Sequence, residues 1–177
     1  MEADSEVELL RIKETLIPAI LIRRVNRFMV EVLLDNKTIL AHLGNSGRLS
    51  DLLVPRAKIL LKRVEASGRR KSTYDLIAVE HANSWVLVDT RMHTDIAMRI
   101  LEREVISELS EYKILRREAK IEDVRIDFLL ERDGVPCLLE VKGCTFVKNN
   151  IGMFPDAPTV RGRRQLEVIL KMMRERG

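Results

Sequence analysis

The chain has 177 residues, which is enough for one domain with a sizeable core or for two small domains that share an interface. Hydrophobic residues make up 46% of it and charged residues 33%, so the composition argues against disorder, while a formal net charge of +4 permits a nucleic-acid ligand. Two cysteines argue against a disulfide framework, and no apolar run reaches the roughly 18 residues of a membrane helix, so we expect a cytoplasmic protein that binds no membrane.

The first half of the sequence predicts a small β-barrel. Its apolar runs are short, recur about every ten residues and are separated by turn signals such as Asp35-Asn36 and Asn45-Ser46-Gly47. This spacing favours an antiparallel barrel or sandwich, and an OB-like barrel that binds DNA is our first choice for residues 1–90. We interpret Tyr74 and Trp85 as core or interface residues. The expected strands cover residues 16–25, 27–35, 37–44, 58–64, 74–80 and 85–90.

The hydrophobic period then changes, and residues 91–112 predict an amphipathic helix that opens the second domain. On such a helix Glu104 and Glu108 would fall within the apolar arc. One of them could be a further metal-site carboxylate. Alternatively, its stem lies along the apolar surface and its charged head reaches water.

Residues 91–177 predict an α/β domain. Expected strands cover 113–120, 124–131 and 135–143, and Asp133-Gly134 is a hairpin turn between the last two. Residues 145–158 continue as strand or loop. The final helix covers 159–177 and places Leu166, Ile169, Leu170 and Met173 on one face.

Three charged residues, Asp127, Glu140 and Lys142, interrupt the two apolar strands of this hairpin. The hairpin can place Asp127 beside Glu140 on one face, because side chains alternate along a strand. Two adjacent carboxylates are suitable ligands for Mg²⁺ or Mn²⁺, and a lysine beside them can orient or activate water against a phosphate. The set predicts metal-assisted phosphodiester hydrolysis. The alternative is an ion-pair patch at a partly exposed sheet edge, which Arg125 would share.

Basic residues occur in clusters that could neutralise DNA phosphates, in some cases beside glycines that allow close backbone approach. For any one cluster the alternative is a solvated charged surface. Only 4% of the residues are aromatic, so we expect contacts to the DNA backbone and weak sequence preference. The candidate DNA-binding residues are Arg23, Arg24, Arg27, Arg48, Arg69, Arg70, Lys71, Arg125, Arg161 and Arg163.

Several segments together resemble the sugar fermentation stimulation protein (SfsA) family. They are "RRVNRFMVEV", "HLGNSGRL", "VDT", "SELSEYKILRRE", "RIDFLL", "CLLEVKGCT" and "FPDAPTVRGRRQL". The resemblance implies an N-terminal OB-like barrel, a C-terminal domain like the PD-(D/E)xK nucleases, DNA as the ligand and a role as a DNA-binding regulator of sugar metabolism genes.

Carried over by position, the resemblance implies that Asp127 and Glu140 are metal ligands and that Lys142 is the catalytic cation. Arg125 matches the position two residues before Asp127, and Arg161 with Gln165 matches a helix that often carries phosphate-binding groups. Asn45, Gly47 and Arg48 match the barrel signature.

The sequence also departs from the family pattern. Asparagines are usual where Asp89 and Thr94 stand, and the family usually continues beyond the last helix with a further strand and helix. A sheet without those elements would have an uncovered edge that a second subunit could fill, as in a homodimer.

Three functions therefore remain open at this point. The first is a DNA-binding protein with a Mg²⁺-dependent nuclease site. The second is a DNA-binding regulator that keeps the nuclease fold without cleaving. The third is an RNA-binding or protein-interaction module built on the barrel.

Overall fold

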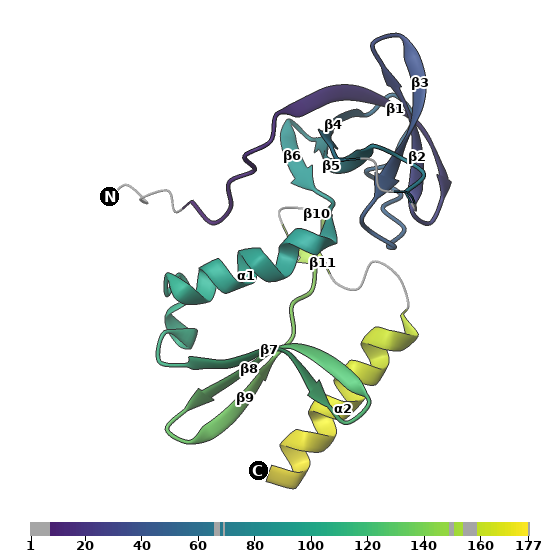
Figure 1. The fold of residues 1–177 in the computed structure, drawn as a ribbon. Helices are drawn as coiled ribbons and strands as arrows, with labels where there is room; N and C mark the ends of the chain where they lie inside the picture. The colour runs from purple at the N-terminus through teal and green to yellow at the C-terminus, as the bar shows by residue number, and fades with distance from the viewer. Residues whose placement is uncertain (1–7, 66–67, 69, 149–150, 154–158, 177) are drawn as a thin grey trace. The chain divides into compact units, whose positions relative to one another are not determined.

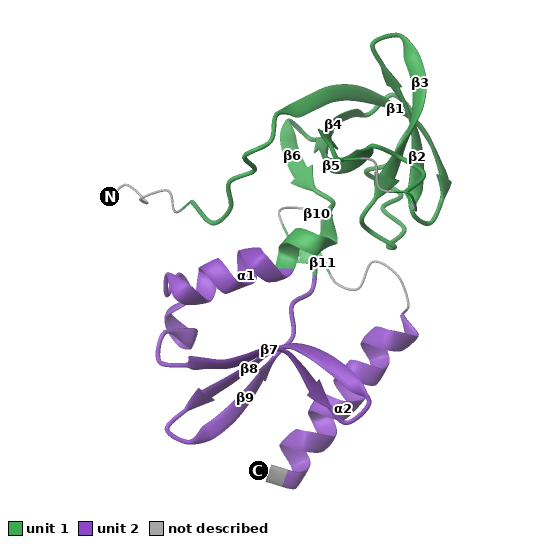
Figure 2. Cartoon of the chain, viewed as in Figure 1, with its two compact units in different colours: residues 1–93, 143–157 green, residues 94–142, 158–177 purple. Residues whose placement is uncertain are grey.

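The computed structural model describes residues 8–65, 68, 70–148, 151–153 and 159–176, and the chain divides into two compact units (Figures 1 and 2). The first unit comprises Met1–His93 and Gly143–Ala157, and the second comprises Thr94–Lys142 and Pro158–Gly177. The sequence predicts one boundary after residue 90, whereas the structure groups Gly143–Ala157 with the first unit. No helix within the described ranges is long and apolar enough to cross a membrane.

Five strands of the first unit close into a barrel, which confirms the predicted OB-like fold (Figure 1). β1 pairs with β2 and β4, β2 pairs with β3, and β4 pairs with β5, all antiparallel. A parallel pairing of β3 with β5 closes the ring, and β6 extends from β5. The strands are β1 Leu16–Asn26, β2 Met29–Leu34, β3 Lys37–Leu43, β4 Lys58–Arg63, β5 Tyr74–His81 and β6 Ser84–Leu87.

Strand periodicity builds the barrel core. Val30 and Val32 on β2, like Ile59 and Leu61 on β4, are two residues apart and have no exposed surface, because alternate side chains point into the barrel. Asp35 and Asn36 both have positive φ, 47° and 60°, as a two-residue type I′ hairpin requires. Tyr74 packs against this core, but Trp85 is 50% exposed and does not belong to it.

The helix that follows is shorter than predicted. The 3₁₀ turn η1 Thr90–Met92 leads into α1 His93–Glu102, and Glu104 then adopts a left-handed conformation with φ of 52°. The Val105 amide donates to the Ile100 carbonyl over 3.1 Å, which closes the helix end in a Schellman motif. The expectation that Glu104 and Glu108 share an apolar helix face is therefore wrong, because both lie beyond the last turn.

The second unit is a three-stranded antiparallel sheet with α1 and a second helix against it. Phe128 and Leu130 pack under α1, while Val124 and Ile126 pack under α2. These four residues alternate along one strand, so both helices cover the same face of that strand. The elements are η2 Ser107–Leu109, β7 Lys113–Ile121, β8 Val124–Arg132, β9 Val135–Leu139 and α2 Val160–Arg176, with sheet order β7-β8-β9.

The face that α2 buries differs from the prediction. Val168 is 1% exposed and packs with Ile169 and Met172 against the sheet. By contrast, Leu166 and two further residues of the predicted apolar face, Leu170 and Met173, are 50% exposed or more. The helix carries apolar residues over more of its circumference than one packing face uses, so periodicity alone does not select the buried side.

Residues 145–158, predicted as strand or loop, include β10 Phe146–Lys148 and β11 Ile151–Met153, which form a small antiparallel hairpin in the first unit.

Candidate functional site

The β8–β9 hairpin brings Asp127 and Glu140 together, as the sequence predicts, although the predicted strand 135–143 ends at Leu139, one residue before Glu140. Its turn is Asp133-Gly134, and its register pairs Phe128 with Leu139, the residues next to the two acids. Beyond that pair, the two segments are joined by hydrogen bonds from backbone amides to side-chain carboxylates. The Asp127 amide donates to Glu140 Oε2 over 3.3 Å, and the Val141 amide donates to Asp127 Oδ2 over 2.7 Å. Each carboxylate is thus held by the backbone of the opposite chain segment.

Lys142 completes the predicted trio. Its Nζ donates to Glu140 Oε1 and, over 2.9 Å, to Gln165 Oε1. The Glu140 side chain is 8% exposed and the Lys142 side chain 29%, so the ion pair lies at the edge of the unit with its acid inside. The two hydrogen bonds fix the Lys142 ammonium beside the Glu140 carboxylate.

Gln165 connects the trio to α2. This side chain belongs to a residue that is 3% exposed, and its Nε2 donates to the Arg125 carbonyl over 2.9 Å. The amide orientation follows from these partners, because only the oxygen can accept from the Lys142 ammonium. Family resemblance alone singled out Gln165. In the structure Gln165 lies at helical spacing from Val168 and Met172, on a packed face that the apolar periodicity of the sequence did not select.

The donor set fits a hard divalent cation. Asp127 and Glu140 accept only some of the hydrogen bonds that their oxygen lone pairs allow, which leaves positions for a cation. Mg²⁺ commonly uses one or two protein carboxylates together with water and substrate oxygens. Within the described ranges, no group of three or more His, Cys, Asp or Glu side chains could hold a metal, so two carboxylates are the most this site offers.

A basic pocket of about 320 Å³ lies in the second unit beside Gln165. Arg164 donates to both carboxylate oxygens of Asp123, over 3.0 and 2.8 Å, and this hydrogen bonding lowers the pKa of Asp123 and raises that of Arg164. Arg125 pairs with Glu118 over 3.1 Å at the surface. The lining residues are Asp123, Val124, Arg125, Arg161, Arg164 and Gln165.

Of the predicted DNA-binding residues on α2, Arg161 therefore shares a pocket with Gln165. Arg163 instead pairs with Glu167 over 2.9 Å on the exposed side of the helix.

Arg24 in the first unit has a structural role that the sequence did not predict. Its five N–H donors all point to backbone carbonyls: Nε to Asn26, Nη2 to Arg27 at 2.8 Å and to Asn45 at 3.4 Å, and Nη1 to Gly47 and Arg48 at 2.6 and 2.7 Å. Burial, together with the nearby Arg27 charge, lowers its pKa. The predicted contact of Arg24 with DNA is not supported, because no donor remains for a phosphate.

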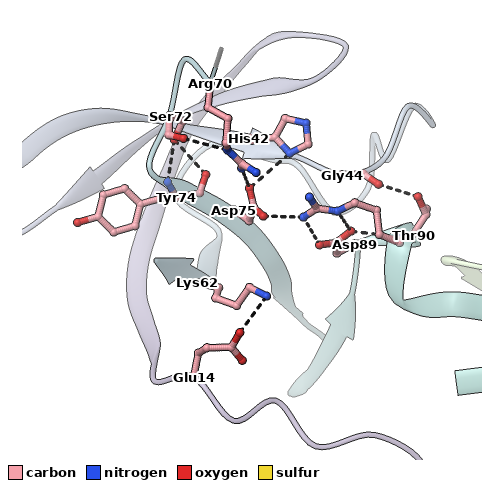
Figure 3. A network of polar contacts seen from close by, with 11 residues as sticks. Glu14, His42, Gly44, Lys62, Arg70, Ser72, Tyr74, Asp75, Asp89 and Thr90 are labelled. Carbon is pink, nitrogen blue, oxygen red and sulfur yellow. Dashed lines mark hydrogen bonds and ion pairs between the residues drawn. The ribbon is translucent and has the colours of Figure 1, made fainter. Parts of the chain in front are cut away.

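A buried ionic network occupies another part of the barrel (Figure 3). Asp75 is 2% exposed and accepts hydrogen bonds from Arg70 and, over 2.7 Å, from Arg91, while His42 Nδ1 lies 3.5 Å from its Oδ1. Arg91 also binds Asp89, and this hydrogen bonding is the first cause of its raised pKa. Arg70 thus pairs with Asp75 through Nη2, and its role as a DNA contact stays a prediction.

The same network approaches the end of β3. The Thr90 hydroxyl donates to the Gly44 carbonyl over 2.6 Å, and the Thr90 amide donates to it over 3.2 Å. Asp89 is 1% exposed and accepts hydrogen bonds from the Arg91 amide and guanidinium. The acid therefore makes polar contacts, although the resemblance implies asparagine at this position.

The remaining predicted DNA-binding residues occupy varied surroundings. Arg23 pairs with Glu31 over 2.7 Å, and the Arg27 guanidinium lies 5.5 Å from the centre of the Phe28 ring. Arg48 lines a separate pocket of the first unit, Lys71 is exposed, and Arg69 lies outside the described residues.

Comparison with known proteins identifies both halves of the chain. A family model described as "SfsA N-terminal OB domain" matches residues 22–88, and one described as "Sugar fermentation stimulation protein RE domain" matches residues 91–177. The solved structure of Pyrococcus furiosus SfsA in complex with Ca²⁺ has a TM-score of 0.84 and 29% identity, and the match covers 96% of this chain and 72% of that one.

Relatives named sugar fermentation stimulation protein homolog share this similarity. The homolog from Methanothermobacter thermautotrophicus is 43% identical to this chain. The match covers 87% of this chain and 64% of the relative's length. That of Clostridium kluyveri is 37% identical over 90% of this chain and 69% of the relative. This chain belongs to the sugar fermentation stimulation protein family.

Proposed function

We propose that the protein binds DNA and hydrolyses its phosphodiester bonds with Mg²⁺ or Mn²⁺. The observation that carries this proposal is the cluster of Asp127, Glu140 and Lys142, in which each carboxylate accepts a backbone amide and the lysine is anchored by Gln165. Groups positioned before the substrate arrives need little reorganisation during the reaction. The Pyrococcus furiosus relative was solved in complex with Ca²⁺, which supports a divalent cation as the ligand of this protein.

In this proposal Asp127 and Glu140 hold the metal, which supplies charge neutralisation at the phosphate and a more acidic water when bound. The Lys142 ammonium neutralises developing charge on the scissile phosphate and orients the attacking water. Gln165 keeps the lysine at that position. Arg161 and Arg125 line the adjoining pocket and would bind a flanking phosphate, which positions the strand without selecting a sequence.

A second candidate function is DNA binding without cleavage by a regulator of sugar metabolism genes. The observation that favours it is the ion pair between Lys142 and Glu140, which occupies one oxygen of a site to which the described part of the chain contributes two acids. Either function places the protein in the cytoplasm with DNA, and a homodimer is compatible with both.

The test compares purified wild-type protein with Asp127→Asn and Glu140→Gln on plasmid, branched and single-stranded DNA, with EDTA, Mg²⁺ or Mn²⁺. Both substitutions keep side-chain size but remove an anionic ligand. Glu111→Gln is the matched control, because Glu111 is an exposed acid of the same unit that pairs with Arg132 away from the trio.

Metal-dependent cleavage that falls at least about 100-fold in both site variants and persists in the control supports the nuclease. DNA binding by all four proteins without cleavage supports the regulator. Absence of any salt-dependent DNA binding by the wild type would reject both.

A further inference from the structure

The first unit contains a pocket that the proposed nuclease does not use. Its volume is about 180 Å³, and its polar and aromatic lining comes from Arg48, Ser50, Asp51, Thr145 and Phe146. It joins two parts of the chain that are far apart in sequence, the loop after β3 and the segment that leads into β10. The second of these begins only three residues after Lys142.

An aromatic ring is available at this pocket. Phe146 is 38% exposed, and its backbone is fixed by antiparallel pairing with Met153 across the β10–β11 hairpin. The Cys144 thiol donates to the Met153 carbonyl over 3.0 Å, which holds the segment before β10 against the hairpin. A ring presented by fixed backbone loses little conformational entropy when a flat ligand stacks on it.

A cation is available at the same pocket. Arg48 makes no ion pair with any described residue, and its loop is held by the two hydrogen bonds from Arg24 to the Gly47 and Arg48 carbonyls. Leu49 and Leu52, which complete the lining, are only 4% and 3% exposed, so the pocket has an apolar inner wall. The combination of ring, cation and apolar wall is suited to a ligand that is both aromatic and anionic.

Asp51 narrows the choice of ligand. A free phosphate inside the pocket would meet its carboxylate, whereas the N–H groups of a nucleobase can donate to that carboxylate. The hydroxyls of Ser50 and Thr145 can donate or accept at a base edge. The base therefore fits inside, and the phosphate beside it fits Arg48.

We propose that this pocket binds one unpaired nucleobase of single-stranded DNA, stacked on Phe146, with the neighbouring phosphate on Arg48. The proposal rests on the proposed function, because it assumes that the protein binds DNA. Bases in an intact duplex are stacked on one another and cannot enter, so the pocket gives a preference for single strands, ends or unpaired sites.

The experiment measures binding by fluorescence anisotropy, in EDTA so that cleavage does not interfere. The probes are a labelled single-stranded oligonucleotide and the blunt duplex of the same sequence at one salt concentration. Wild type is compared with Phe146→Leu, which removes the ring but keeps an apolar side chain, and with Phe146→Tyr, which keeps the ring. Trp85→Leu is the matched control, because Trp85 is an exposed aromatic of the same unit outside the pocket.

We expect Phe146→Leu to weaken single-strand binding by about 5- to 150-fold, the range for loss of one base-stacking contact, and to leave duplex binding unchanged. Phe146→Tyr and Trp85→Leu should bind like wild type. If Phe146→Leu does not fold, as judged by circular dichroism, Arg48→Gln replaces it. This variant should lower single-strand affinity and reduce the salt slope by about one.

Equal affinity of wild type and Phe146→Leu for the single strand, or an equal loss for single strand and duplex, would overturn the pocket assignment while leaving DNA binding intact. Wild type that binds neither probe would overturn the assignment together with the proposed function. The two failures are therefore distinguishable in one set of measurements.

Discussion

Replacing Gly44 by alanine should destabilise the first unit, because a side chain at this position meets the buried ionic network (Figure 3). A Cβ atom on Gly44 would lie 2.4 Å from Asp89 Oδ1, 2.9 Å from Asp89 Cγ and 3.1 Å from Arg91 Nε. Asp89 cannot turn away freely, since it is 1% exposed and its Oδ1 accepts from Arg91 Nε over 2.8 Å. Either the carboxylate or the β3 terminus must move.

The expected change in the free energy of unfolding follows from two destabilising effects and one stabilising effect. Overpacking of a well-packed site costs about 1–3 kcal/mol, and weakening one hydrogen bond to a charged group costs about 1.5–3 kcal/mol. Alanine also lowers the entropy of the unfolded chain, which stabilises by about 0.4–1 kcal/mol. We expect a net loss of about 2–4 kcal/mol in the free energy of unfolding.

The assay is urea unfolding followed by circular dichroism. Gly68→Ala is the control, because a Cβ atom there meets nothing within 4 Å, and its stability should stay within about 1 kcal/mol of wild type. A double-mutant cycle with Asp89→Ala then locates the clash. In that background most of the penalty of Gly44→Ala should disappear, since the obstructing carboxylate is gone.

Two results would refute this reasoning. One is a Gly44→Ala variant as stable as wild type, which would mean that the network accommodates the methyl group at no cost. The other is an equal penalty with and without the Asp89 carboxylate, which would place the strain in the backbone.

Three further predictions concern side chains with defined local geometry. Arg24→Lys should lower the free energy of unfolding by about 2 kcal/mol, because an ammonium cannot reach the five carbonyls that the guanidinium serves; urea unfolding measures this. Glu104→Gly should raise it by about 1 kcal/mol while Glu104→Ala does not, since only glycine adopts the observed φ of 52° without a steric penalty. The pKa of Asp123 is lowered below 3.8 by its hydrogen bonds from Arg164, so this pair stabilises the fold above about pH 4 and the contribution is lost as pH falls through the folded pKa. Asp123→Asn should therefore be less stable than wild type at neutral pH and equal to it in strong acid, as unfolding curves at the two pH values would reveal.

The strands and the core of the candidate site could be predicted from the sequence, because both depend on short-range patterns. Alternation of apolar residues marked β8, and Asp133-Gly134 marked its turn. Once that hairpin is in register, Asp127 and Glu140 must be neighbours. The closeness of the two acids is thus a local consequence of strand periodicity and turn chemistry.

Other features depend on contacts between residues distant in sequence, so they could not be predicted from local patterns. Gln165 meets Lys142 because α2 packs across β8, and the buried face of that helix could not be selected from its broad apolar surface. Arg24 is one of several clustered cations in the sequence, but the carbonyls of loop 45–48, together with those of Asn26 and Arg27, use all its donors. The parallel β3–β5 pairing and the return of Gly143–Ala157 to the first unit are likewise set by packing, on which local propensity has no influence.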